Sequence, residues 1–217
     1  MSFDTFVTLV RSRFPGIGDA QLKQFQQLPA LYAAWNEKIN VVSRKDMDAL
    51  YEHHVLHSLA IAAWLQTRPE LEAAFREGKI LDLGTGGGFP GIPLAILYPE
   101  ASFLLCDSIG KKVTVAREIA SSLGLAHAEA VQARAETLEG PFDFVVTRAV
   151  ATLTDLYPWV RGKYRHGLIA LKGGLSLPEE IAEYTRKYKK GAVSTWPAGS
   201  WLTDPYYSEK YVVYCGI

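Results

Sequence analysis

The fold is decided by the stretch Ile80-Leu81-Asp82-Leu83-Gly84-Thr85-Gly86-Gly87-Gly88-Phe89-Pro90-Gly91. An apolar pair leads to an acid and then to a run of glycines, which indicates a buried strand that ends in a tight loop. Glycine is required where a Cβ would prevent a positive φ or the close approach of a ligand. A glycine loop after the first strand of an α/β sheet is typical of proteins that bind nucleotide-like cofactors.

The glycine loop is compatible with two kinds of cofactor. The spacing from Gly86 to Gly91 satisfies the dinucleotide fingerprint, and Asp107 lies where a ribose-binding acid is expected. Two details favour S-adenosylmethionine over a nicotinamide cofactor. Asp82 stands two residues before the first glycine, at the expected strand end, and the glycines from Gly84 to Gly88 alternate. A structural turn that binds no ligand is the remaining interpretation.

Composition sets the limits of the fold. A chain of 217 residues corresponds to one α/β domain with some extra elements. Hydrophobic residues make up 48%, enough for a sizeable core, and no apolar run approaches the ~20 residues of a membrane span. A net charge of zero argues against an overall polycation and leaves room for a local basic face.

The two cysteines, Cys106 and Cys215, fall in predicted strands and lack the spacing of metal ligands. They indicate buried thiols in a reducing compartment, with a pairing in space left open, and no metal site is predicted. The N-terminus lacks a basic segment followed by an apolar one, so no signal peptide is predicted.

The chain divides into a helical part, residues 1–77, and an α/β part, residues 78–217. An apolar stripe from Phe6 to Phe14 predicts a first helix. Asp19 is expected to cap a second, which carries Leu22, Phe25 and Leu28 inward. The apolar residues between 31 and 39 predict a separate third helix, and a fourth covers residues 50–65.

The second part alternates strands with helices. Strands are predicted at 79–83, 102–107, 128–132, 142–147, 167–171 and 211–214, and helices at 92–97, 111–123, 153–160 and 179–188. This alternation implies a mostly parallel sheet. In such sheets ligands bind at the carboxyl ends of the strands, near the point where the strand order reverses.

Polar residues stand at those strand ends. Asp107 ends the second strand, where a carboxylate either binds the ribose hydroxyls or caps the following helix. Ala135 and Glu136 follow the third strand, where adenine is usually held, although Glu136 also fits a solvated loop. Arg148 ends the fourth strand, the usual location of residues between methyl donor and acceptor.

The stretch from Leu81 to Ala95, with its tail Phe-Pro-Gly-Ile-Pro-Leu, resembles the small-subunit ribosomal RNA guanine-N7 methyltransferase G family. Further matches lie in order along nearly the whole chain: Trp35–Asn40, His54–Leu59, Asp107-Ser108, Lys111-Lys112, Arg148-Ala149 and Ala170–Gly173. One departure is His57, where the family usually has Asp. We interpret this histidine as structural and assign it no catalytic role.

The resemblance implies a class I S-adenosylmethionine-dependent methyltransferase, with a Rossmann-like, mostly parallel seven-stranded sheet and a helical N-terminal extension. It implies S-adenosyl-L-methionine as cofactor and N7 of one 16S rRNA guanosine as substrate, in free RNA or in the 30S subunit or its assembly intermediate. We expect a cytoplasmic monomer that does not associate with membranes. The expected cofactor-binding residues are Asp82, Gly84, Gly86, Gly88, Phe89, Asp107, Ala135, Glu136 and Arg148. Arg148 and Lys172 are expected at the RNA-facing mouth as catalytic residues.

The chemistry agrees with what the sequence lacks. Guanine N7 offers a lone pair and has no proton to lose, so methyl transfer needs in-line positioning more than acid or base catalysis. Enzymes that methylate exocyclic amines usually carry Asn/Asp-Pro-Pro-Tyr after the fourth strand, where this chain has Val146–Val150. The similar segment Asp204–Tyr207 comes much later and is interpreted as a turn.

Two basic clusters are candidates for RNA binding, because phosphate contacts supply most of the non-specific affinity. One is Arg161, Lys163, Arg165 and His166; the other is Arg186, Lys187, Lys189 and Lys190, with Lys38, Arg44 and Lys45 as further candidates. The second cluster equally fits a solvated helix end whose cations suit the helix dipole. The alternative functions are a small-molecule methyltransferase, a non-catalytic cofactor-binding RNA or ribosome-assembly factor, and a nicotinamide oxidoreductase.

Overall fold

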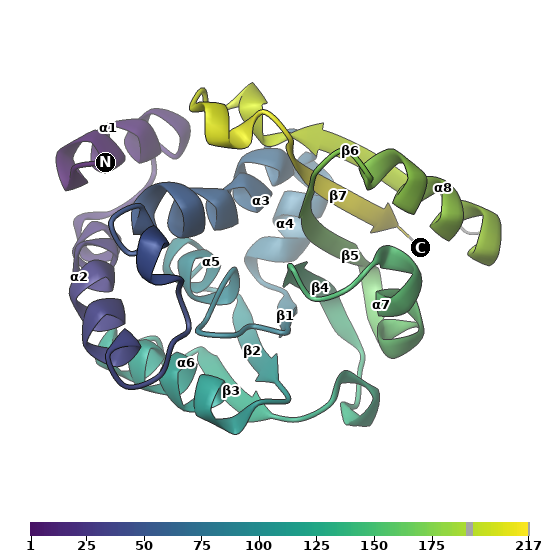
Figure 1. Ribbon diagram of the computed structural model, residues 1–217, viewed down its shortest axis with the longest axis horizontal. Helices are drawn as coiled ribbons and strands as arrows, with labels where there is room; N and C mark the ends of the chain where they lie inside the picture. Colours follow the sequence, from purple (N-terminus) through teal and green to yellow (C-terminus); the bar gives the residue numbers. More distant parts are fainter. Residues whose placement is uncertain (190–192, 217) are drawn as a thin grey trace.

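A seven-stranded sheet organises the molecule, seen in a computed structural model that describes residues 1–189 and 193–216 (Figure 1). Its spatial order is β3-β2-β1-β4-β5-β7-β6. The strands are β1 (Lys79–Leu83), β2 (Ser102–Asp107), β3 (Ala128–Gln132), β4 (Phe142–Arg148), β5 (Tyr164–Gly173), β6 (Val193–Pro197) and β7 (Lys210–Gly216).

The strand order reverses beside β1. The chain runs outward from β1 through β2 to β3, and then returns to place β4 on the other side of β1. Strands β1 to β5 are parallel, and β7 is antiparallel to both β5 and β6. The crevice at the carboxyl ends of β1 and β4 is therefore the expected ligand site of this fold.

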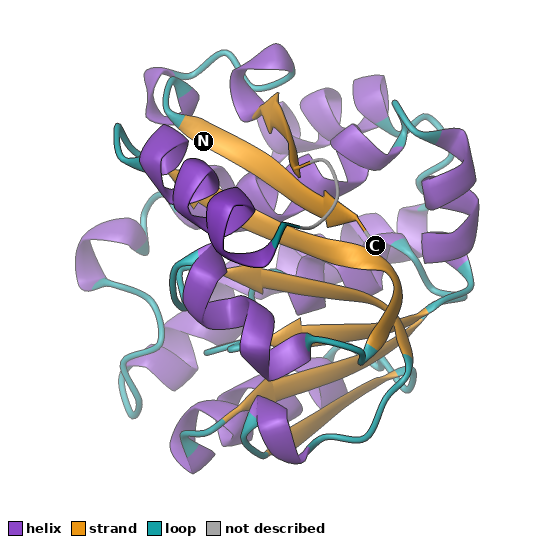
Figure 2. Ribbon diagram, turned by 90° about the vertical axis from the view of Figure 1, so that its right-hand side faces the viewer, coloured by secondary structure: helices purple, strands orange, loops and turns teal. Residues whose placement is uncertain are grey.

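Helices cover both faces of the sheet (Figure 2). They are α1 (Phe3–Arg13), α2 (Asp19–Asn36), α3 (His57–Leu65), α4 (Pro69–Arg76), α5 (Gly91–Leu97), α6 (Gly110–Ser122), α7 (Leu153–Val160) and α8 (Leu177–Tyr188). Helices α1 to α6 share one continuous core with one face of the sheet, whereas α7 and α8 build a second core on the other face. Since β1 is covered on both sides, its residues Ile80 to Leu83 are all buried, as expected for a central parallel strand.

The N-terminal helices differ from the sequence prediction at α2. The second and third predicted helices form one helix, because Leu28 and Tyr32 continue a single buried stripe across Pro29. Gly18, and not Asp19, is the N-cap residue. The Gln21 side chain accepts a hydrogen bond from the Gly18 N–H at 2.8 Å, which satisfies one of the orphan donors of a helix start.

Three further elements correct the prediction. The helix expected at 50–65 begins as a π-helical segment, Leu50–Leu56, before α3. Helix α4 is absent from the prediction, although Pro69 at its first turn is a typical start signal. Strand β6 is also absent from it, because β6 is a short edge strand that lacks buried positions. None of the described helices is both long and apolar enough to cross a membrane.

Candidate active site

The glycine loop after β1 adopts the conformation that its sequence predicts. Gly84, Gly86 and Gly88 have φ values of 69°, 57° and 114°, in the region that favours glycine. A Cβ on Gly84 would overlap the side chain of Val150, which closes over the loop from the end of β4. Gly84 is therefore required for both conformation and space.

Asp82 lies beneath this loop and braces it. Its Oδ2 accepts hydrogen bonds from Thr85 Oγ1 at 2.6 Å and from the Gly91 N–H at 2.8 Å. Burial raises the pKa of the Asp82 carboxyl to about 7, against the effect of both hydrogen bonds. The side chain is fully buried, so Asp82 shapes the loop from below and does not line the neighbouring pocket.

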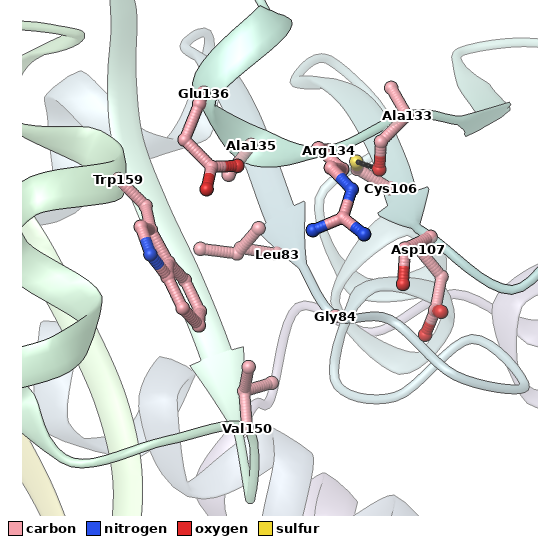
Figure 3. A pocket seen from close by; sticks show the side chains of 11 residues that line it. Leu83, Gly84, Cys106, Asp107, Ala133, Arg134, Ala135, Glu136, Val150 and Trp159 are labelled. Carbon is pink, nitrogen blue, oxygen red and sulfur yellow. Dashed lines mark hydrogen bonds between the residues drawn. The ribbon is translucent and has the colours of Figure 1, made fainter.

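A pocket opens above the loop, which we call the Asp107 pocket (Figure 3). It is lined by Leu83, Gly84, Cys106, Asp107, Ser108, Ala133, Arg134, Ala135, Glu136, Val150 and Trp159. Asp107 and Trp159 lie on opposite sides of it, and Glu136 lies on the same side as Trp159 (Figure 3). The structure thus brings together Gly84, Asp107, Ala135 and Glu136 as predicted.

Asp107 has the helix-capping role, one of the two that the sequence left open, and its binding of the ribose hydroxyls stays a prediction. Its Oδ1 accepts a hydrogen bond from the Ile109 N–H at 2.9 Å, at the start of α6. Its Oδ2 accepts one from the Gly86 N–H at 3.0 Å, so the carboxylate also fixes the glycine loop. Each carboxylate oxygen can accept a second hydrogen bond, which leaves acceptor capacity for hydroxyls in the pocket.

Phe89 does not line the Asp107 pocket and is 3% exposed. Its ring stacks on Tyr32 of α2 with centroids 4.8 Å apart, and the Tyr32 hydroxyl donates to the Gly87 carbonyl at 2.8 Å. The N-terminal helix therefore supports the glycine loop directly. Sequence reasoning did not identify this role of Tyr32, and only the apolar stripe of α2 pointed to its burial.

Asn36, from the segment that resembles the family in the N-terminal part, has a structural role. Its Oδ1 accepts from the N–H groups of Val41 and Val42 at 2.8 and 3.0 Å, and its Nδ2 donates to the Val42 carbonyl. The turn fixed in this way presses Val41 against Gly87, where a Cβ would lie 2.8 Å from Val41 atoms. Asn36 thus also holds the glycine loop in place.

A second pocket, which we call the Arg148 pocket, lies on the other side of the segment Arg148–Val150. Its volume is about 470 Å³, compared with about 200 Å³ for the Asp107 pocket. It is lined by Asp46, His53, His54, His57, Arg148, Ala149, Leu171, Lys172, Gly173, Glu180, Tyr206 and Lys210. Arg148 and Lys172 therefore lie in this pocket, apart from the predicted residues that line the first.

Arg148 is held by the helical segment before α3. Its guanidinium donates to the His53 carbonyl at 3.3 Å and to His54 Nδ1 at 2.9 Å, and its Cζ lies 5.0 Å from the Phe89 ring centroid. Burial lowers the pKa of Arg148, partly offset by Tyr206 and Asp82. Arg148 is thus engaged with the helical segment and the Phe89 ring, and it lines the Arg148 pocket and not the Asp107 pocket.

Lys172 is engaged within the protein. Its ammonium lies 2.7 Å from Glu180 Oε1 and donates to the Ala151 carbonyl. The same Glu180 oxygen accepts from the Leu153 N–H at 2.7 Å. This ion pair therefore fixes the segment that connects β4 to α7, and with it Val150 above Gly84.

Two of the histidines that line the Arg148 pocket, His54 and His57, have lowered pKa values. Burial, followed by the charge of Arg148, lowers the pKa of His54 to about 4 and that of His57 to about 3. His57 contacts the rings of Tyr206 and Tyr207 edge to face, and its Nε2 lacks a hydrogen-bond partner among the described residues. Apolar surroundings of this kind fit the structural role that the sequence indicates for His57.

The cysteines are not placed for nucleophilic chemistry. Neither forms a disulfide within the described residues, and both are buried. Burial raises the pKa of the Cys106 thiol to about 11 and that of Cys215 to about 12, so both stay protonated near neutral pH. Within the described part of the chain, no group of His, Cys, Asp and Glu side chains could hold a metal ion.

The two predicted basic clusters differ in their contacts. Lys163 donates to the carbonyls of Ala135 and Glu136 at 2.6 and 2.7 Å, and Arg165 pairs with Asp143 at 3.1 Å. These cations of the first cluster thus have partners inside the protein. In the second cluster Arg186, Lys187 and Lys189 are exposed, whereas Lys190 lies outside the described residues.

The left-handed glycine loop, the carboxylate at the end of β2 and the pocket at the switch point define a class I S-adenosylmethionine-dependent methyltransferase. The magnesium protoporphyrin IX methyltransferase of Synechocystis, solved with bound S-adenosylmethionine, has this fold: TM-score 0.59, 17% identity, covering 100% of this chain and 97% of that one. The model of the rRNA small subunit methyltransferase G family matches residues 21–197, so the chain belongs to that family.

Relatives in this family match the chain along nearly its full length. Ribosomal RNA small subunit methyltransferase G of Porphyromonas gingivalis is 46% identical over 215 residues, which cover 95% of this chain and 91% of that protein. Its counterpart in Bacteroides thetaiotaomicron is also 46% identical, over 96% of this chain and 99% of that protein. The family resemblance, the fold class and the cofactor predicted from the sequence are thereby confirmed.

Proposed function

We propose that this protein transfers a methyl group from S-adenosylmethionine to N7 of one guanosine in 16S rRNA. The observation that carries the proposal is the arrangement of two pockets on either side of Arg148–Val150, at the carboxyl ends of β1 and β4. One pocket suits the methyl donor and the other suits the acceptor. Family membership supports ribosomal RNA as the acceptor.

The Asp107 pocket fits the cofactor. Its apolar walls, Leu83, Val150 and Trp159, face a carboxylate and the backbone of residues 133–136, as expected for a site that binds an adenosine. In this proposal Asp107 accepts hydrogen bonds from the ribose hydroxyls, and Ala135 and Glu136 hold the adenine edge. Bound S-adenosylmethionine supplies an electrophilic methyl group on a sulfonium.

The other predicted residues act through the loop. Asp82, Gly86 and Gly88 set the shape of the backbone against which the cofactor rests, and Phe89 anchors that loop to α2 and to Arg148. Arg148 orients the acceptor at the boundary of the two pockets. Lys172 holds the β4–α7 connection through Glu180, so we assign it a positioning role instead of a direct contact with the reacting atoms.

No base is required for the reaction that we propose, because N7 attacks with a neutral lone pair. The neighbouring histidines agree with this, since the pKa of His54 and that of His57 are both lowered well below neutrality by burial. Rate acceleration then comes from orientation, in which small misplacements cost orders of magnitude.

We further propose that the protein acts as a monomer in the cytoplasm and away from membranes, on 16S rRNA that is free or within the 30S subunit or its assembly intermediate. In this view residues 1–77 are an extension that buttresses the methyltransferase domain of residues 78–217. The continuous core between α1–α6 and the sheet supports that organisation.

The test is a nucleoside analysis by mass spectrometry of 16S rRNA from the parent strain, a deletion strain and a strain complemented with the gene. We expect one N7-methylguanosine to disappear on deletion and to return on complementation. Unchanged 16S rRNA would contradict the proposal and favour a small-molecule acceptor. Restoration by a variant that no longer binds the cofactor would indicate a non-catalytic assembly factor.

A further inference from the structure

The segment Asp204–Tyr207 contributes to the Arg148 pocket in a way that its position in the chain does not suggest. It forms a single turn of 3-10 helix before β7, and Asp204 Oδ1 accepts from the Tyr206 N–H at 2.8 Å. Tyr207 turns inward, where its hydroxyl donates to the Glu52 carbonyl and 2% of its surface is exposed. Tyr206 turns the other way and lines the pocket.

Tyr206 and His53 form a flat aromatic pair at the wall of this pocket. Their ring centroids are 3.9 Å apart and the planes differ by 15°. The pair is fixed from two sides, because His53 Nδ1 lies 2.9 Å from Asp46 Oδ1 and the Tyr206 hydroxyl donates to the His53 carbonyl at 3.4 Å. The side chain of His53 is 29% exposed, so the pair presents ring surface to solvent.

Two of the three cations that line this pocket are engaged within the protein. Arg148 donates to two atoms of the segment that carries His53, and Lys172 is paired with Glu180. The third, Lys210, lies with its Nζ 5.1 Å from the centroid of the Tyr206 ring, so His53 supplies the ring surface that is left for a ligand. Aromatic faces bind bases that have left their stack, because every base has a π surface and stacking on Tyr or His is favourable.

We propose that the stacked pair of His53 and Tyr206 is the platform on which the acceptor base rests once it has turned out of the RNA. The ligand is a nucleobase of single-stranded or locally opened RNA, and both residues have positioning roles. This inference rests on the proposed function, since the base must reach the donor across Arg148–Val150. Stacking on the platform then compensates for the stacking that the base loses when it leaves the RNA.

The experiment measures single-turnover methylation of 16S rRNA from a strain that lacks the gene, with excess protein and saturating S-adenosylmethionine. Tyr206→Leu and His53→Ala remove a ring, whereas Tyr206→Phe and His53→Phe keep one. The quantity compared is the ratio of the rate constant to the half-saturating RNA concentration. We expect Tyr206→Leu and His53→Ala to lower this ratio about ten- to a hundredfold. Tyr206→Phe and His53→Phe should retain the wild-type ratio within about threefold.

Tyr207→Phe is the matched control, because it changes the same turn without touching the pocket, and it should behave like wild type. Calorimetry with S-adenosylhomocysteine should give equal affinities for all variants. Full activity in Tyr206→Leu, or equal losses in Tyr206→Leu and Tyr206→Phe, would overturn the stacking role. A wild-type protein that transfers no methyl group to 16S rRNA would instead overturn the proposed function, and this inference with it.

Discussion

The Asp107 pocket and the Arg148 pocket are neighbours built in different ways. The first is made largely from the ends of three consecutive strands and uses backbone atoms and one carboxylate. The second gathers side chains from segments between Asp46 and Lys210, and several of its charged groups are engaged within the protein, since Lys172 pairs with Glu180 and Arg148 donates to His54. In the function that we propose, the first pocket holds the methyl donor and the second receives the acceptor base.

The largest expected effect concerns the buried ion pair of the Arg148 pocket. Lys172→Met leaves Glu180 unpaired, and removing one partner of a buried pair costs about 3–5 kcal/mol of unfolding free energy. Both side chains are mostly buried, at 12% and 17% exposed. Urea unfolding measures the loss, and methyl transfer should fall with it because the β4–α7 connection loses its brace.

The double variant Lys172→Met with Glu180→Gln is the control for this prediction. It should be less destabilised than the sum of the two single variants, since neither buried charge is left alone. A Lys172→Met protein of normal stability that cannot methylate RNA would show that Lys172 acts on the substrate directly.

The second prediction concerns Asp82 beneath the glycine loop. Its pKa is raised to about 7 by burial, so the folded state favours the protonated carboxyl. Its stabilising contribution is present at low pH and is lost as the pH rises through about 7. Compared with Asp82→Asn, the wild type should lose up to about 1.4 kcal/mol of unfolding free energy per pH unit in this range. Parallel stability curves for the two proteins between pH 5 and 8 would contradict the raised pKa.

The third prediction concerns Gly84, which lines the Asp107 pocket. Gly84→Ala places a Cβ at φ 69° and against Val150, whereas Gly124→Ala has φ 70° and no described atom within 4 Å of the new Cβ. Gly124→Ala should cost about 1–2 kcal/mol of stability, the penalty of the left-handed conformation, and Gly84→Ala should cost more because its Cβ also overlaps Val150. Only Gly84→Ala should weaken S-adenosylhomocysteine binding, by about tenfold or more, or 1.4 kcal/mol. Equal affinities in calorimetry would separate Gly84 from the cofactor.

The fourth prediction tests Asp107 in the first pocket. Asp107→Ala should weaken S-adenosylhomocysteine binding by about 1.5–3 kcal/mol, the scale of a missing hydrogen bond to a charged group. Asp204→Ala is a suitable control, because it removes another carboxylate that accepts a backbone N–H, outside this pocket. If calorimetry finds the Asp107 variant unchanged, its carboxylate serves the start of α6 and the glycine loop alone.

The smallest effect is expected outside both pockets. Arg186 and Lys187 are exposed on α8, and reversing both to Glu should weaken 16S rRNA binding a few-fold while the cofactor affinity stays constant. The slope of log affinity against log salt should fall by about one for each phosphate that the protein no longer neutralises. Lys23→Glu on α2 controls for charge alone, and an equal weakening in that variant would move the RNA surface away from α8.

The sequence predicts the Asp107 pocket well for a physical reason. Its residues follow strand ends, and buried strands with alternating helices are recognisable from apolar patterning. The strand order therefore brings together, at the carboxyl ends of the strands, Gly84, Asp107, Ala135 and Glu136. Asp82 and Phe89 belong to the predicted loop, but their side chains turn into the core because they hold the loop's shape.

The Arg148 pocket could not be predicted in the same way. Tyr206 lies 58 positions after Arg148, and its meeting with His53 depends on the final antiparallel strand β7, which patterning alone does not orient. Lys172 is recognisable by its motif, but its pairing with Glu180 depends on the packing of α8. Two further differences have the same origin, because tertiary contacts override local signals. The helix boundary expected near residue 31 is absent because a buried stripe continues through α2. Strand β6 is not predicted because it forms by pairing at the edge of the sheet.

The central claim is that this protein methylates guanine at N7 in 16S rRNA. The most direct measurement incubates 16S rRNA from a strain lacking the gene with the protein and S-adenosylmethionine, followed by borohydride and aniline treatment. We predict one new strand break at a guanosine, which is absent when S-adenosylmethionine is left out of the incubation. Methyl incorporation into rRNA that resists this cleavage would contradict the N7 assignment, and the absence of incorporation would contradict the substrate.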